Sequence, residues 1–137
     1  MGVTYRLKAD IENLEDALNP ILNAVEMADG DPKIAFKVHL SLEELISNVM
    51  LYAYAPETGD VTLSYEIDAD KVLAVTIIDE GKPFNPLEAE TPDVTLAATD
   101  RKIGGLGIFL AKKTMDEITY RRENNQNLLI VKKRLVA

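Results

Sequence analysis

The chain has 137 residues, a formal net charge of −8 and no cysteine, and its 47% hydrophobic and 28% charged residues are typical of one folded domain over residues 1–137. The negative charge disfavours direct binding to nucleic acid or to an acidic membrane surface, and the lack of cysteine excludes disulfides and Cys-ligated metals. No stretch has the apolar run of a signal peptide or of a membrane span, so we expect a cytoplasmic protein with no membrane partner.

The first part of the chain predicts a strand followed by two helices. Apolar and polar residues alternate over residues 3–9, which is the period of a half-buried strand. Asp10 is placed to cap a helix whose apolar spacing continues to about Met27. The run at residues 30–32, Gly-Asp-Pro, closes that element and starts the next helix, which is predicted to continue with one apolar stripe to about Tyr54.

The rest of the chain predicts two strands, a lid, a helix and two closing strands. The expected elements are strands at 61–65 and 73–77, a helix that opens at Gly104 to Gly107 and continues through Met115, and strands at 117–122 and 128–135. Between Asn85 and Lys102 the periodicity is lost, which predicts a mobile lid. This order predicts an α+β two-layer sandwich with helices on one face of a mostly antiparallel, mixed sheet.

A carboxylate and a carboxamide share one face of the second long helix. Glu44 and Asn48 are four residues apart, so both project from the same side. The Asn side-chain oxygen is a neutral ligand suited to Mg²⁺, which takes much of its coordination from water and substrate phosphates. A carboxylate one turn earlier can polarise an attacking hydroxyl or water. An ordinary polar pair on a solvated helix face is the alternative.

Asp79 ends an apolar strand and is followed by Gly81. A carboxylate at this place can accept a hydrogen bond from an adenine amino group, and a glycine lets the backbone pass close to the base. A simple turn after a strand is the alternative explanation. His39 is the only histidine, and we interpret it as a structural helix residue because no partner ligand accompanies it.

A glycine cluster lies where the lid becomes a helix. Free backbone N–H groups and the positive end of a helix dipole favour phosphate, so Gly104, Gly105 and Gly107 are candidate phosphate binders. Lys102, immediately upstream, is within reach of phosphate oxygens. A flexible hinge with solvated charges is the alternative.

In this order the three motifs resemble those of the GHKL (Bergerat-fold) ATPases, and within them the small bacterial anti-sigma-factor serine kinases. The resemblance covers nearly the whole chain and uses the N-box-like residues 44–48, the G1-like residues 79–86 and the G2-like residues 104–110. Three positions depart from the family pattern: Tyr52, where histidine is frequent, Pro83, where the broader superfamily has glycine, and Ile130, near a frequent threonine.

The resemblance implies an ATP-binding, Mg²⁺-dependent protein-serine kinase that takes part in transcription regulation. Glu44 would be the catalytic base, Asn48 the Mg²⁺ ligand and Asp79 the adenine reader, and the other nucleotide-binding residues would be Gly81, Lys102, Gly104, Gly105, Leu106 and Gly107. The implied partners are a sigma factor and a STAS-domain anti-anti-sigma protein that serves as substrate. The family also implies a homodimer, for which the strand around residues 3–7 offers a pairing edge.

Besides a structural protein whose set of motifs is fortuitous, two other interpretations remain open at this point. One is a nucleotide-gated binding module without kinase activity, in which ATP only orders the segment from Asn85 to Lys102. The other is the ATP-binding half of a two-component histidine kinase. The chain argues against the latter because it leaves no room for a phosphoacceptor helix pair and because His39 lies inside the catalytic domain.

Overall fold

The computed structural model describes residues 2–88 and 105–137. Three helices and five strands follow one another as β1 (Val3–Lys8), α1 (Leu14–Met27), α2 (Pro32–Asn48), β2 (Asp60–Ile67), β3 (Val72–Asp79), α3 (Gly105–Thr114), β4 (Glu117–Glu123) and β5 (Gln126–Arg134). Short helical turns lie at Ile11–Asn13, Val49–Ala53 and Pro86–Glu88. The described part of the predicted lid therefore contains one 3₁₀ turn, and its remainder lies outside the described residues.

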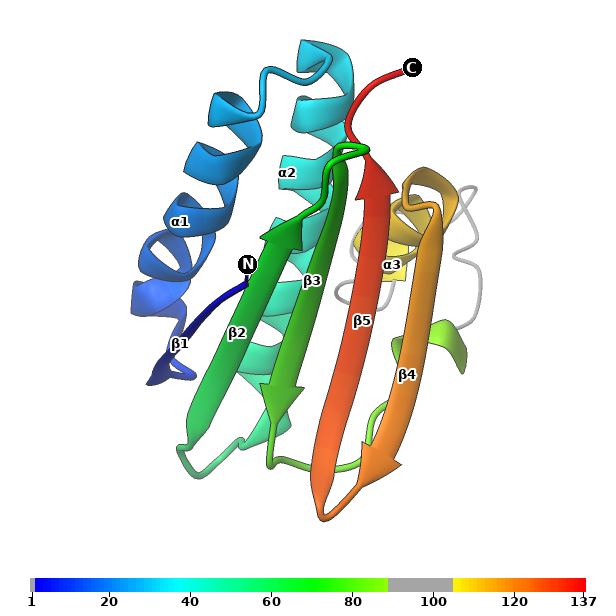
Figure 1. Ribbon diagram of the computed structural model, residues 1–137. Coiled ribbons are helices and arrows are strands. Elements are labelled where there is room, and N and C mark those ends of the chain that lie inside the picture. The colour runs from blue at the N-terminus through cyan, green and yellow to red at the C-terminus, as the bar shows by residue number, and fades with distance from the viewer. Residues whose placement is uncertain (1, 89–104) are drawn as a thin grey trace.

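The helices cover one face of a single sheet, which confirms the predicted two-layer α+β sandwich (Figure 1). The strand order is β1-β2-β3-β5-β4, so β1 and β4 form the two edges. Every ladder among the described strands is antiparallel, so the sheet is not mixed as the sequence had predicted. The parallel pair is avoided because the chain crosses from β3 through α3 to the edge strand β4 and then returns beside β3 as β5.

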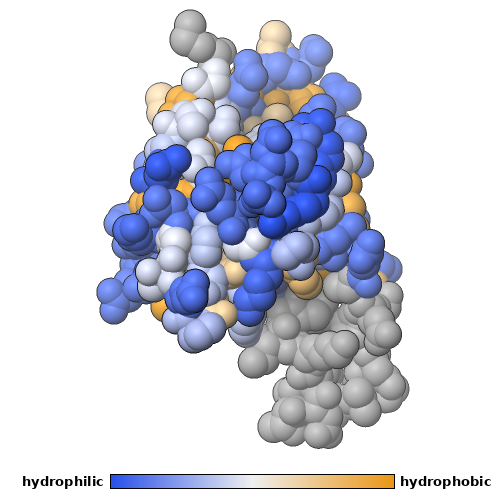
Figure 2. All heavy atoms as spheres, turned by 90° about the horizontal axis from the view of Figure 1, so that it is seen from below, coloured by the Kyte–Doolittle hydropathy of each residue, from blue (hydrophilic) through white to orange (hydrophobic). Residues whose placement is uncertain are grey.

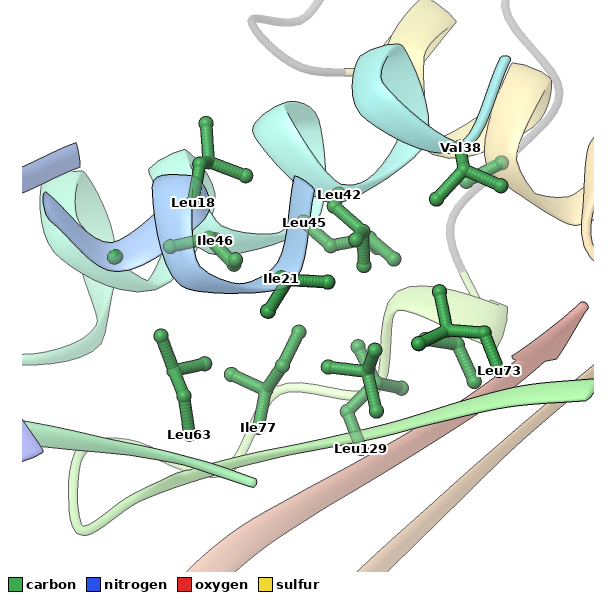
Figure 3. Close-up of a cluster of buried hydrophobic side chains, with 14 of the residues drawn as sticks. Leu18, Ile21, Val38, Leu42, Leu45, Ile46, Leu63, Leu73, Ile77 and Leu129 are labelled. Atoms are coloured by element: carbon green, nitrogen blue, oxygen red, sulfur yellow. The ribbon is translucent and has the colours of Figure 1, made fainter. Parts of the chain in front are cut away.

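Period-two alternation along the strands builds the inner face of the sheet. In β3, residues Leu73, Val75 and Ile77 are at most 1% exposed, whereas the residues between them are half-buried on the other face. Figure 3 shows the apolar side chains of α1 and α2 pointing toward those of the sheet. The labelled side chains of this core are Leu18, Ile21, Val38, Leu42, Leu45, Ile46, Leu63, Leu73, Ile77 and Leu129.

The capping residues act where the sequence predicts helix starts. Asp31 Oδ1 accepts a hydrogen bond of 2.8 Å from the backbone N–H of Lys33, and Pro32 occupies the first helical position of α2. Asp10 accepts in the same way from Glu12, at the 3₁₀ turn that leads into α1. In the described part of the chain, no helix combines the length and the apolar character needed to cross a bilayer.

The C-terminal end of α2 departs from the prediction of one regular helix to Tyr54. After Asn48 the backbone continues as a π-helical turn over Val49–Ala53. The carbonyl oxygen of Ala53 accepts a hydrogen bond of 2.9 Å from the backbone N–H of Lys82, in the loop that follows β3. π-Turns of this kind are frequent at functional sites, and here the turn joins α2 to the loop after Asp79.

Candidate functional site

A cavity of about 510 Å³ lies between the end of α2 and the sheet, at the end of the molecule where β3 terminates. Figure 2 views the molecule from this end, and its surface there is mostly hydrophilic. The lining is mainly apolar with a few polar groups: Leu45, Asn48, Val49, Tyr52, Ala53, Ile77, Asp79, Lys82, Pro83, Phe84, Pro86, Ile108, Tyr120, Asn127 and Leu129. An apolar pocket with a few convergent polar groups is the usual form of a small-molecule site.

Asp79 is the buried charged group of this cavity. Side chains alternate along β3, and Asp79 lies on the same face of the strand as the core residues. Its carboxylate is therefore buried, and the residue is only 5% exposed. Oδ1 accepts hydrogen bonds from the backbone N–H of Gly81 at 2.8 Å and from the Asn127 amide at 2.9 Å. Burial raises the pKa of Asp79, and these hydrogen bonds and the nearby charge of Arg122 partly offset that rise.

Asn127 is a site residue that the sequence reasoning missed. It is 5% exposed and forms hydrogen bonds with Asp79 and with the loop after β3. The prediction had placed residue 127 in the turn before the last strand, whereas β5 begins at Gln126. Counting back by two from the core residues Val131 and Leu129 would have found it, because a polar residue on an apolar strand face requires a specific partner.

Gly81 is required by close packing against the π-helical turn. A Cβ at this position would overlap the carbonyl oxygen of Ala53 and would lie 2.6 Å from its carbonyl carbon. The loop is also tied from the other side, because the Arg122 guanidinium donates to the Gly81 carbonyl at 2.8 Å. The sequence predicts that this glycine lets the backbone pass close to a base, and the structure adds a packing contact with the turn that follows α2.

The Tyr54 hydroxyl connects the same loop to β2. It accepts a hydrogen bond of 2.7 Å from the backbone N–H of Glu80 and donates one of 2.6 Å to the Asp60 carbonyl. Together with the bond from Lys82 N–H to the Ala53 carbonyl, this fixes residues 80–82 at both ends. The loop that carries Asp79 into the cavity is therefore anchored to α2 and to two strands.

Glu44 and Asn48 lie together on α2, as the spacing predicts. The Asn48 amide nitrogen is 3.5 Å from Glu44 Oε1, and both side chains are partly buried. Burial raises the pKa of Glu44, a shift that the hydrogen bond from Asn48 opposes and the charge of Glu43 increases. Asn48 lines the cavity directly, whereas Glu44 lies one turn earlier and is outside the lining.

Gly107 packs against Glu44 at the start of α3. A Cβ at this glycine would overlap Cγ and Cδ of Glu44 and would lie 2.6 Å from its Oε2. Gly107 and the Glu44 carboxylate, which are far apart in sequence, are thus brought close together. Gly105 is the first residue of α3 and is followed by Leu106, whereas Lys102 and Gly104 lie outside the described residues.

The positions that depart from the family pattern lie in different places. Tyr52 and Pro83 line the cavity, and Tyr52 is 44% exposed. Ile130 lies on the face of β5 that points away from the core, so its neighbour Leu129 lines the cavity and Ile130 does not. His39 Nε2 lies 3.5 Å from Glu43 Oε2 on α2, and neither residue lines the cavity.

Among residues 2–88 and 105–137, no group of three or more His, Cys, Asp or Glu side chains is placed to hold a metal ion. The polar residues that line the cavity are instead spread over several elements: Asn48 and Tyr52 on the helix side, Asp79, Asn127 and Tyr120 on the sheet side, and Lys82 in the loop after β3. An apolar cavity with polar residues on several elements suits a small ligand that carries both apolar and polar groups.

Comparison with known proteins places the chain in a family. The model described as "Histidine kinase-like ATPase domain" matches residues 7–133. A serine-protein kinase RsbW of Listeria monocytogenes is 31% identical over 98 residues, which cover 68% of this chain and 62% of the relative. The chain thus spans about three fifths of the length of the RsbW relatives. Serine/threonine-protein kinase BtrW of Bordetella bronchiseptica is 24% identical over 127 residues, covering 92% of this chain and 89% of the relative.

A solved structure agrees with the fold. The RsbU and RsbW domains of a Mycobacterium tuberculosis protein match with a TM-score of 0.69 at 13% identity, over 98% of this chain and 32% of that one. At this identity the likeness concerns the fold alone. Because the family model extends over residues 7–133, the chain belongs to the histidine kinase-like ATPase domain family.

Proposed function

We propose that the cavity binds Mg²⁺-ATP and that the protein is an anti-sigma regulator which phosphorylates a serine of a STAS-type antagonist protein. The observation that carries the nucleotide part is Asp79, a buried carboxylate at the end of an apolar cavity with Asn48 on the facing helix. Relatives named serine-protein kinase support the activity.

The sheet side of the cavity fits a purine base. No described residue donates to Asp79 Oδ2, because both hydrogen bonds to this carboxylate end on Oδ1. An exocyclic amino group can therefore donate to Oδ2, while Ile77 and Leu129 contact the faces or edges of the ring. Phe84, which is 53% exposed and lines the cavity, adds apolar surface near the base.

The helix side of the cavity fits the phosphates and their metal ion. Asn48 would supply a side-chain oxygen to Mg²⁺, which prefers oxygen ligands and keeps several waters and phosphate oxygens. The N–H groups at the start of α3, at Gly105, Leu106 and Gly107, would face the phosphates, joined by Lys102 and Gly104 from the preceding segment. These assignments use the residues that the sequence singled out and require no three-carboxylate metal cage.

Glu44 is the candidate base. Bound ATP would supply the transferable γ-phosphoryl group, and the protein's task would be to accept the proton of the attacking serine hydroxyl. Burial raises the pKa of Glu44, which makes its carboxylate a stronger base than an exposed one. The contacts with Asn48 and Gly107 fix this side chain beside the metal ligand and the start of α3.

The partner part of the proposal concerns two proteins and a second copy of the chain. A sigma factor would be bound and silenced until the STAS-type antagonist replaces it. The edge strand β1 has no neighbour on its outer side among the described strands and would pair with β1 of a second copy. This part is supported by the family and by the names of the relatives.

The test is a phosphotransfer assay with purified STAS-domain antagonists and Mg²⁺-ATP. Glu44→Gln should lower transfer by at least about a hundredfold while ATP affinity stays within about threefold of the parent. Glu43→Gln is the matched control, because Glu43 is exposed, pairs with His39 and acts on Glu44 only through its charge, so it should change transfer by less than about threefold. Equal transfer by the Glu44→Gln variant would contradict the role given to this carboxylate.

The alternative function is a nucleotide-gated binding module without kinase activity. It is favoured by the position of Glu44 outside the cavity lining, with its carboxyl against Gly107. In that case no antagonist would be phosphorylated, and the affinity for the sigma factor would differ between the ATP-bound and the ADP-bound protein.

A further inference from the structure

The Asn127 amide is completely hydrogen-bonded inside the cavity. Its nitrogen donates to Asp79 Oδ1 at 2.9 Å and to the Lys82 carbonyl at 2.8 Å. Its oxygen accepts from the Tyr120 hydroxyl at 2.5 Å and from the Phe84 N–H at 3.4 Å. A primary amide has two donor hydrogens and two acceptor lone pairs, so every hydrogen-bonding position of Asn127 is used.

This network allows a single orientation of the amide. If the amide were turned over, its oxygen would face the Asp79 carboxylate and the Lys82 carbonyl, neither of which can donate. Its NH₂ group would also face the Phe84 N–H, which is a donor. The Asn127 amide is therefore fixed as a donor to Asp79, and the hydroxyl of Tyr120, on the edge strand β4, donates to the amide oxygen.

The fixed amide in turn fixes the Asp79 carboxylate. Oδ1 receives both donors, so the plane of the carboxylate is set and Oδ2 is the oxygen available to a ligand in the cavity. Among the influences that lower the pKa of Asp79 against the effect of burial, the hydrogen bond from Asn127 is the largest. Asn127 thus supports both the orientation and the ionised state of the acceptor.

We propose that Asn127 is a specificity-determining residue of this site, because it holds Asp79 as a fixed hydrogen-bond acceptor that selects a purine with an amino group at position 6. This inference rests on the proposed nucleotide binding. A 6-oxo purine presents a carbonyl to Oδ2 and is rejected, and a purine without a 6-substituent loses the hydrogen bond. Asn127 acts through Asp79, so it is a positioning residue.

The experiment compares two ligands that differ in one group. ATP and purine riboside 5′-triphosphate, which lacks the 6-amino group, are titrated by calorimetry with Mg²⁺ into the parent, Asn127→Ala and Gln126→Ala. The parent should prefer ATP by about tenfold or more, as expected for a hydrogen bond to a buried carboxylate. Asn127→Ala should reduce this preference to less than about threefold, mainly by weakening ATP. Gln126→Ala is the control, since the Gln126 side chain donates to exposed Glu80 and does not line the cavity.

A second variant keeps the test informative if Asn127→Ala folds poorly. In Asn127→Asp the new carboxyl can donate to Asp79 only when it holds a proton, so the preference for ATP should be lost at about pH 8 and should recover toward about pH 5.5. The other ionisable groups around Asp79 are Arg122, Lys82, Glu80, Tyr54 and Tyr120, and all of them are retained in this variant. The ratio of two triphosphates cancels the titration of the phosphates themselves.

The outcomes separate this inference from the function on which it rests. If the parent prefers ATP and Asn127→Ala weakens both triphosphates equally, Asn127 is only structural and the inference is overturned. If the preference is unchanged in Asn127→Ala, or if Asn127→Asp shows no recovery at low pH, the inference is also overturned while the nucleotide site stands. If the parent binds neither triphosphate, the proposed function fails together with it.

Discussion

Gly81→Ala should strongly destabilise the protein, although it adds a single methyl group. The methyl would overlap the Ala53 carbonyl oxygen and would lie 2.6 Å and 2.8 Å from the carbonyl carbon and the Cβ of that residue. Backbone atoms of a helical turn cannot move aside as the end of a long side chain can. Relief therefore requires that the loop after β3 separates from Val49–Ala53.

The size of the effect follows from three contributions. Overpacking costs about 1–3 kcal/mol, and loss of the 2.9 Å bond from Lys82 N–H to the Ala53 carbonyl costs about 1 kcal/mol. The smaller conformational freedom of alanine in the unfolded chain returns about 0.4–1 kcal/mol. The free energy of unfolding should therefore fall by about 1–4 kcal/mol, with a central value of about 2 kcal/mol.

Urea denaturation measures this change, with an expected shift of the midpoint by about 1–2 M at an unchanged slope. Gly2→Ala is the matched control, because a Cβ there would meet its nearest atom at 3.5 Å, and its stability should stay within about 0.5 kcal/mol of the parent. A Gly81→Ala variant as stable as the parent would refute the packing role assigned to this glycine.

Three further substitutions test the electrostatics and the contact between α2 and α3. Because burial raises the pKa of Asp79 in the folded state, the stability of the protein should fall as the pH rises above about 4 through that raised pKa. Asp79→Asn should remove this fall, which thermal unfolding across pH can follow. At pH 7 the variant should be as stable as the parent or up to about 1 kcal/mol more stable. The pKa of Asp116 is shifted in the opposite direction, because hydrogen bonds from the Arg134 N–H and from Lys133 lower it. Asp116 therefore stabilises the fold at neutral pH, and this contribution is lost as the pH falls below about 4. Asp116→Asn should reduce the acid sensitivity of the same unfolding curves. Gly107→Ala should displace the Glu44 carboxyl and lower phosphotransfer by about tenfold or more, with a smaller change in ATP affinity. Equal transfer by this variant and the parent would show that the contact between Gly107 and Glu44 is unimportant.

The layout of the fold was predictable because its elements carry strong local patterns. Alternation along β3 and the apolar stripe of α2 both specify which face is buried, and Asp10 and Asp31 mark the starts of helical turns. The π-helical turn after Asn48 was not predictable in this way. It depends on a tertiary hydrogen bond between Ala53 and Lys82, which lie 29 positions apart in the printed sequence.

The candidate site was predictable in part. Asn48 and Asp79 line one cavity, as motifs on separate elements had indicated, whereas Glu44 lies beside Asn48 but outside the lining. Asn127 was missed because its importance comes from partners on three different segments rather than from a local motif.

Calorimetric titration of ATP into the purified protein, with and without Mg²⁺, addresses the nucleotide site itself. The parent should bind ATP in a Mg²⁺-dependent manner, and Asn48→Ala should lose that dependence and at least about tenfold in affinity. His39→Ala, which changes a residue on the same helix outside the cavity lining, should bind as the parent does. Absence of ATP binding by the parent, or Mg²⁺-dependent binding that survives in Asn48→Ala, would contradict the assignment of the cavity as an Mg²⁺-ATP site.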